Sequence, residues 1–271
     1  IFPKWGVTGA AVGTLASRVT MLIFVVILLY RDPRTATIIR QLVPKRLYKK
    51  ELNQLLQLGL PSSLQMFFEV SFFTFAIWVC GFLSKDAQAA NQIALNLSSM
   101  TFMVAMGLSV AATIRVGNQK GFKAFGELKR IALSVFLLTL LLDVVFAGVF
   151  VACNEWLPWL YLDSATGLDT FAVAELAGSL LFIAAFFQIF DGAQVVALGS
   201  LRGLQDVRIP TWITFLAYVL IGVPVMLCLS VEAAMGARGV WIGLCLGLVV
   251  SSLLLYLRFR YLSNKLIRTN G

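Results

Sequence analysis

The stretch FIAAFFQIFDGAQVVALGSLRGLQD, residues 182–206, decides how the whole chain is interpreted. It is mostly apolar and long enough to cross a bilayer as a helix, yet it carries Asp191 near its middle. A carboxylate at the centre of a membrane helix costs roughly 2.5–3.5 kcal/mol on insertion scales, so it is rare unless it is used or paired. Gln188 and Gln194 lie three residues before and after it, on neighbouring helix positions.

We therefore expect Asp191 to face the protein interior or a wet cavity rather than lipid. The alternative is that it only caps or pairs within the helical bundle. The stretch closes with Gly199, Arg202, Gly203 and Asp206, which predict a helix end that reaches water.

The composition excludes most soluble classes of protein. The 271 residues are 59% hydrophobic and 13% charged, which is typical of a polytopic membrane protein. There is no histidine, the four cysteines form no CxxC pair, and no glycine loop followed by lysine is present to hold a nucleotide. We predict no enzyme activity and no cofactor. The net charge of +9 comes from basic residues in alternate loops, so we predict no nucleic-acid partner.

Hydrophobic runs predict an all-α integral membrane protein with about seven spans, near residues 7–30, 55–82, 89–113, 131–153, 171–201, 209–230 and 240–257. Eighteen of the 22 lysines and arginines fall on one side of this arrangement. The positive-inside rule places that side in the cytoplasm, together with the basic linker 31–53 and the C-terminus. We expect a multi-pass protein of the plasma (inner) membrane.

Few charges lie inside the spans. Glu69 is in the second span, with Gln65 four residues before it on the same helix face. Asp143 in the fourth span has no polar neighbour in sequence, and Arg18 interrupts the first. The roles of Asp143 and Arg18 stay open at this point. Kinks are expected at Pro61 and Pro224.

Three segments resemble one known family: LGLPSSLQMFFE (58–69), QIALNLSSMTFMVAMGLSVAATIRVGNQKG (92–121) and FQIFDGAQVVALGSLRG (187–203). The chain resembles the multidrug and toxic compound extrusion (MATE) antiporters, especially their NorM-like bacterial branch. The family fold has twelve helices in two six-helix lobes. The resemblance implies helix six in 1–30, the cytoplasmic linker in 31–53, the C-terminal lobe in 54–262 and a cytoplasmic tail in 263–271. The N-terminal lobe would be missing from this chain.

The resemblance also implies the site. Glu69 and Asp191 match the family's acidic residues that help to bind the coupling cation, H+ or Na+, so a sodium ion could bind at both. In the family a tyrosine precedes the second acid by one turn, and here that position is Phe187. A phenyl ring offers no hydroxyl oxygen, which leaves proton coupling at least as well supported as sodium. Supporting polar residues would be Gln65, Asn96, Gln188 and Gln194, and candidates for an apolar cavity wall are Phe67, Phe68, Phe187 and Phe190.

The ion-binding chemistry of a buried carboxylate agrees with this mechanism. A carboxylate taken out of water can bind a proton or sodium ion on one side of the membrane and release it on the other, and when it is ionised it attracts an organic cation. The leading hypothesis is a secondary antiporter that exports cationic or amphiphilic compounds. Its partners would be small organic cations, membrane lipid and the missing lobe. The alternatives are a flippase for a lipid-linked saccharide and a non-functional fragment.

Overall fold

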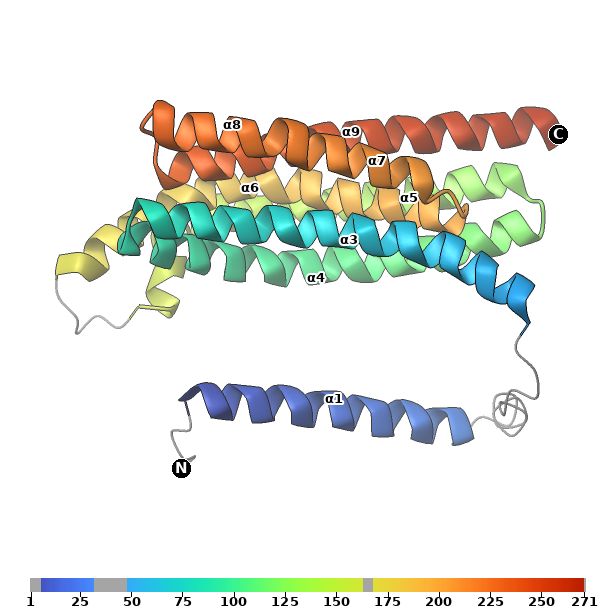
Figure 1. Ribbon diagram of the computed structural model, residues 1–271, viewed down its shortest axis with the longest axis horizontal. Helices are drawn as coiled ribbons and strands as arrows, with labels where there is room; N and C mark the ends of the chain where they lie inside the picture. The colour runs from blue at the N-terminus through green and yellow to red at the C-terminus, as the bar shows by residue number, and fades with distance from the viewer. Residues whose placement is uncertain (1–5, 32–47, 163–167, 271) are drawn as a thin grey trace. The chain divides into compact units, whose positions relative to one another are not determined.

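The computed structural model describes residues 6–31, 48–162 and 168–270, and helices make up nearly all of them. No strand occurs in these ranges, which confirms the predicted all-α fold (Figure 1). The elements are, in order, α1 (Gly6–Arg31), α3 (Lys49–Leu83), α4 (Lys85–Gly121), α5 (Phe125–Ala152), η1 (Leu157–Leu160), α6 (Leu168–Gly203), α7 (Arg208–Phe215), η2 (Leu216–Gly222), α8 (Val223–Leu227), η3 (Cys228–Glu232) and α9 (Ala237–Asn270).

The seven predicted spans are confirmed within the described residues. Their bounds are Ala11–Arg31, Lys49–Leu83, Lys85–Gly121, Phe125–Ala152, Thr170–Gly203, Arg208–Glu232 and Ala237–Thr269. Most helices are longer than the hydrophobic runs that predicted them. With 37 residues, α4 is about 55 Å long, well beyond the ~30 Å hydrocarbon core, because its polar ends continue as helix outside the lipid.

The chain divides into two units, Ile1–Gln54 and Leu55–Gly271. The first unit contains α1, an apolar helix with Arg18 at its centre. Most of the predicted linker 31–53 lies outside the described residues, because residues 32–47 belong to a gap between the described ranges. The second unit contains most of α3 and all of the later elements, and it carries the site described below.

The centre of the second unit is α6, which packs against α4, α5 and α9. Near its C-terminal end it approaches α4 closely, and Gly203 leaves room there for the α4 backbone. A Cβ atom at Gly203 would lie 2.7 Å from the Thr113 carbonyl oxygen. Two α4 hydroxyls donate to α6 carbonyls in the same region, Ser109 Oγ to Val195 O at 2.6 Å and Thr113 Oγ1 to Gly199 O at 2.9 Å. Small residues and such hydrogen bonds hold helices together where no water is present to drive association.

Aromatic rings join α3 to the sixth span. Phe72 stacks on Tyr218 with ring centroids 4.9 Å apart, and Phe68 meets Phe215 at 5.2 Å. Pro61 lies inside α3, and its carbonyl oxygen accepts a hydrogen bond from Thr211 Oγ1 at 2.9 Å. Phe72 and Tyr218 are fully buried and belong to the main apolar core of this unit.

The sixth span is wound unevenly. Two stretches, η2 and η3, are π-helix, and they lie on either side of the short α8 that contains Pro224. Proline has no backbone N–H, so the regular hydrogen-bond ladder cannot continue through it. The sequence predicts a kink at this proline, and the structure shows wide turns before and after it.

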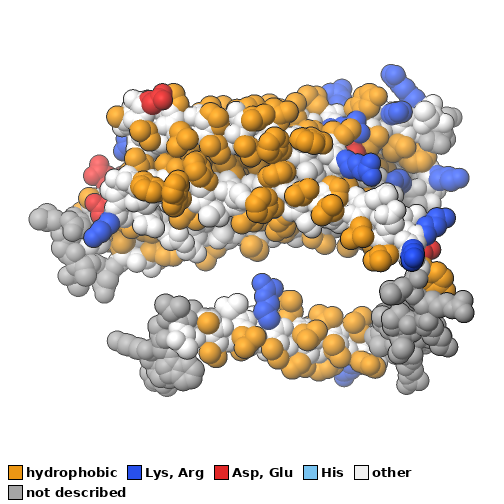
Figure 2. All heavy atoms as spheres, in the orientation of Figure 1, with side chains coloured by type: hydrophobic (Ala, Val, Ile, Leu, Met, Phe, Trp, Pro, Cys, Tyr) orange, Lys and Arg blue, Asp and Glu red, His pale blue; other side chains and the backbone are white. Residues whose placement is uncertain are grey.

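Basic side chains gather at one end of the second unit, where α9 finishes (Figure 2). Near this end Lys120 Nζ donates to the Leu204 carbonyl at 2.7 Å, and Arg258 Nε pairs with Asp206 Oδ2 at 2.7 Å. These contacts tie α4 and α9 to the turn that follows α6. The location of this end in the cytoplasm stays a prediction of the positive-inside rule.

Candidate functional site

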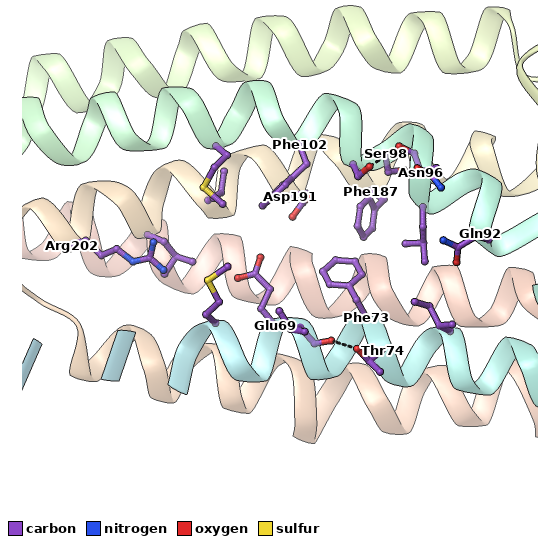
Figure 3. A pocket seen from close by; sticks show the side chains of 18 residues that line it. Glu69, Phe73, Thr74, Gln92, Asn96, Ser98, Phe102, Phe187, Asp191 and Arg202 are labelled. Carbon is purple, nitrogen blue, oxygen red and sulfur yellow. Dashed lines mark hydrogen bonds between the residues drawn. The ribbon is translucent and has the colours of Figure 1, made fainter. Parts of the chain in front are cut away.

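A cavity of about 410 Å³ lies between α3, α4 and α6. Its charged lining residues are Glu69 from α3 with Asp191 and Arg202 from α6. Figure 3 shows the two carboxylates pointing from their helices into the same space. Two carboxylates that were placed in different spans by sequence therefore share one cavity.

Asp191 is the more deeply buried of the two acids, with 6% of its surface exposed. Its Oδ1 atom is buried and has no hydrogen-bond partner among the described residues. Glu69 is partly buried, and its negative charge acts on Asp191. A buried carboxylate oxygen without a partner is costly, and a second negative charge nearby adds to the cost. A proton or a cation bound between the two acids would relieve both penalties.

Arg202 also faces this cavity, from the helix end that the sequence predicts at this position. The α6 helix continues to Gly203. Arg202 is eleven positions after Asp191, close to three full turns, so both project from the same helix face. Arg202 donates a hydrogen bond to Gln65 Oε1 at 3.2 Å, and its charge acts on Glu69, while its buried Nε atom has no partner within the described ranges.

Phenyl rings form much of the apolar wall. Phe187 is buried and meets Phe73 of α3 edge to face, with centroids 5.9 Å apart, and Phe102 of α4 completes this side (Figure 3). Of the four predicted wall residues, Phe187 lines the cavity. Phe68 and Phe190 pack against the apolar core instead, and Phe67 is exposed and borders a neighbouring hollow. Phe73 and Phe102 also line the cavity and were not among the predicted wall residues.

The predicted polar residues divide in a similar way. Asn96 lines the cavity from α4, beside Gln92 and Ser98. Gln65 is buried and accepts the hydrogen bond from Arg202 at the cavity's end. Gln188 and Gln194 do not line the cavity, because each points to a different neighbouring helix.

Gln194 has a hydrogen-bond partner that was not among the predicted site residues. The hydroxyl of Tyr218, in η2, donates to Gln194 Oε1 at 2.5 Å, and the ring is fully buried. The charges of Glu69 and Asp191 both act on Tyr218, so this hydroxyl lies within the electrostatic range of the site. A tyrosine inside a charge-free apolar span was the available signal, since buried tyrosine hydroxyls usually find a polar partner.

Asp143 lies on α5, behind the cavity wall. Its side chain is 3% exposed and presses on Gly192 of α6, so that a Cβ atom at Gly192 would overlap the carboxylate. Gln188 Nε2 donates to the Asp143 backbone carbonyl at 3.4 Å, and Asp143 Oδ2 has no partner in the described part of the chain. The charge of Asp143 acts on Asp191, although Asp143 is not a lining residue. The structure thus places it against a partner helix.

Comparisons with known proteins agree on one group. The MatE family model matches residues 61–227. The chain is 34% identical over 270 residues to a "Probable multidrug resistance protein NorM" of Agrobacterium fabrum, covering 98% of this chain and 57% of the relative. It is 38% identical to "Multidrug resistance protein MdtK" of Yersinia pestis, covering 79% of this chain and 46% of the relative. The chain spans about half the length of these relatives.

Solved structures give the same result for the fold. The structure described as "Outward-facing conformation of a multidrug resistance MATE family transporter of the MOP superfamily" matches with a TM-score of 0.82 at 20% identity. The match covers 97% of this chain and 58% of the other. At this identity the likeness concerns the fold alone.

Proposed function

The chain belongs to the MatE family, and on that basis we propose that it forms one half of a secondary antiporter that exports cationic or amphiphilic compounds in exchange for H+ or Na+. It is a multi-pass membrane protein, and the members of this family are transporters. The names of the NorM and MdtK relatives support multidrug efflux as the activity. The other half of the transport path would come from a first lobe, against which this one rocks, as in other repeat-built transporters.

One observation carries the proposal: Glu69 and Asp191 face a single cavity that is otherwise lined mainly by apolar and aromatic residues. Ionised acids attract an organic cation, and phenyl faces add cation–π contact and apolar surface. The coupling ion and the substrate compete for the same negative charges, so binding of one favours release of the other. That competition is the coupling step of an antiporter.

The coupling ion is part of the proposal. No group of three Asp, Glu, Cys or His side chains converges within the described residues, so a sodium ion would need neutral oxygens beside the two carboxylates. A proton needs only the carboxylates themselves. Both ions fit the unpaired Asp191 oxygen, and Phe187 supplies no hydroxyl ligand.

The lipid-linked saccharide flippase is the weaker alternative. Such a substrate carries phosphate charges, and it would need an excess of cations in the cavity. Here two acids face a single arginine, Arg202, which also has Gln65 as a partner. The charge balance therefore favours a cationic cargo.

The test uses the complete two-lobed transporter in proteoliposomes, with an imposed proton or sodium gradient and a fluorescent cationic substrate. Asp191→Asn and Glu69→Gln should each reduce gradient-driven transport to background, because an amide keeps the shape but cannot carry the exchanged charge. Protein abundance should not fall, since removing a buried charge lowers the cost of insertion.

Asp143→Asn is the matched control, because it removes a buried carboxylate that lies near Asp191 but outside the cavity lining. It should leave most of the transport intact. Normal transport by Asp191→Asn would make that residue structural and overturn the site. Phe187→Tyr then tests the ion: stronger dependence on sodium would identify the missing hydroxyl as a ligand, and an unchanged rate would favour protons.

A further inference from the structure

A second cavity, of about 300 Å³, lies between α5 and α9, away from the transport cavity. It is formed by the first turns of α5 and by a segment of α9 near its C-terminal end. We call it the α5–α9 groove. Its lining residues are Lys129, Ala132, Leu133, Phe136, Tyr256, Phe259, Arg260 and Ser263.

The lining of the groove changes from cationic to apolar along its length. Lys129 lies near the N-terminal end of α5, and Arg260 lies in the C-terminal third of α9. Phe136 lies seven residues deeper than Lys129, which is about 10 Å along the helix, and it meets Tyr256 with ring centroids 5.2 Å apart. One end of the groove is thus cationic and the deeper end is apolar. An amphiphilic ligand with an anionic head and an apolar chain matches this gradient.

The cations of the groove are unneutralised, in contrast to their neighbours. Arg130 pairs with Glu127 at 3.2 Å, and Arg258 pairs with Asp206 at 2.7 Å. Lys129 Nζ instead contacts a neutral oxygen, Asn264 Oδ1, at 2.9 Å. Within the described ranges, neither Lys129 nor Arg260 has an acidic partner.

The position of the groove in the membrane indicates which kind of ligand it would bind. The hydrophobic run of α5 begins near residue 131 and that of α9 ends near residue 257, so Lys129 and Arg260 lie just outside the apolar segments, at the level expected for lipid headgroups. The positive-inside rule assigns this level to the cytoplasmic leaflet. Basic pockets between membrane helices on the cytoplasmic side are typical sites for anionic lipid headgroups.

We propose that the α5–α9 groove binds one anionic phospholipid, with its phosphate between Lys129 and Arg260 and an acyl chain along Leu133 and Phe136. The site is separate from the transport cavity, so it stands whether or not the proposed antiport is correct. The bound lipid would join α5 to α9 at the membrane surface.

The experiment titrates the purified 271-residue chain in neutral detergent with phosphatidylglycerol and, separately, with phosphatidylcholine, and counts bound lipids by native mass spectrometry. The unmodified chain should bind one phosphatidylglycerol in preference to phosphatidylcholine. The double variant Lys129→Gln/Arg260→Gln should weaken that binding by about 30-fold, since each cation near the surface contributes about fivefold.

Lys123→Gln/Arg268→Gln is the matched control, because it removes two exposed basic residues near the same end of the unit but outside the groove. It should bind phosphatidylglycerol like the unmodified chain. Leu133→Trp, which fills the apolar part without changing the charge, should also weaken binding.

Three results would overturn the proposal. The first is equal binding of the two lipids by the unmodified chain, and the second is an equal loss in the control pair, which would indicate diffuse charge attraction. The third is displacement of the lipid by soluble glycerol phosphate at the same concentration, which would identify a phosphate site rather than a lipid site.

Discussion

Helices α4 and α6 meet in two ways along their length. Toward their C-terminal ends, in what we call the closed half, the two backbones are in contact at Gly199 and Gly203. There the hydroxyls of Ser109 and Thr113 donate hydrogen bonds to α6 carbonyls. In the open half, both helices contribute residues to the cavity that Glu69 and Asp191 face, and Ser98 of α4 is one of them. Ser98 Oγ is buried and has no hydrogen-bond partner in the described part of the chain.

Each half of α4 contains a serine, and the two serine hydroxyls differ in whether they make a hydrogen bond. Ser98 and Ser109 are eleven residues apart, close to three turns, so they lie on the same face of α4. Ser109 uses its hydroxyl to hold α6, whereas the Ser98 hydroxyl makes no hydrogen bond within the described residues. The closed half supplies rigidity, and the open half keeps polar groups unsatisfied at a cost in stability. Three substitutions test this division.

The largest effect is expected from Gly199→Ala in the closed half. The new Cβ atom would lie 2.5 Å from the Ser109 backbone oxygen, so the helices would have to separate. We expect the free energy of unfolding to fall by about 1–3 kcal/mol, as for other overpacked sites. Thermal unfolding of the chain in detergent measures this. Gly107→Ala on α4 is the control, since nothing lies within 4 Å of its Cβ position. Equal losses in both variants would mean that the close approach does not matter.

A smaller loss is expected from Ser109→Ala. The substitution removes the 2.6 Å hydrogen bond to the Val195 carbonyl without adding any atom. A net loss of about 0.5–1.5 kcal/mol is expected from such a bond. The same unfolding assay measures it, and an unchanged midpoint would show that the hydroxyl does not hold the helices together.

No loss of stability is expected from Ser98→Ala, because it removes a buried hydroxyl that has no hydrogen-bond partner within the described residues; the free energy of unfolding should stay the same or rise by up to about 1 kcal/mol. Substrate binding should respond instead. In the complete transporter, we expect affinity for a fluorescent cationic substrate to weaken by about 2- to 10-fold if the hydroxyl contacts the cargo. A clear loss of stability, with binding unchanged, would contradict the division between the two halves.

Much of the fold can be predicted from the sequence, because lipid strongly restricts which backbone structures can cross a membrane. Apolar runs of sufficient length must form helices in lipid, and this gives the seven spans. The insertion cost of a carboxylate singles out Glu69 and Asp191, which share one cavity in the structure.

The direction of individual side chains was harder to predict. Gln188 and Gln194 are each three residues from Asp191, which places them about 60° to either side of it on the helix. That angle is enough to turn Gln188 toward α5 and Gln194 toward η2. A helix that is apolar on every face also gives no periodic signal, so Phe73 could not be separated from Phe68. Arg202 lies in the last turn of α6, at the predicted helix end, but its side chain was not predicted to line the cavity.

The π turns of the sixth span affect how homologous chains can be compared. A π turn holds about one residue more than an α turn, so deleting one residue in η2 with a return to α winding would leave the later side chains on nearly the same helix faces. The same deletion in an α-helical stretch would rotate everything after it by about 100°. The π turns therefore let this span gain or lose one residue during evolution while it keeps its face toward α9. Two homologues that differ by one residue in η2 or η3 would present matching side chains to α9 only when their alignment places the gap inside the π turn.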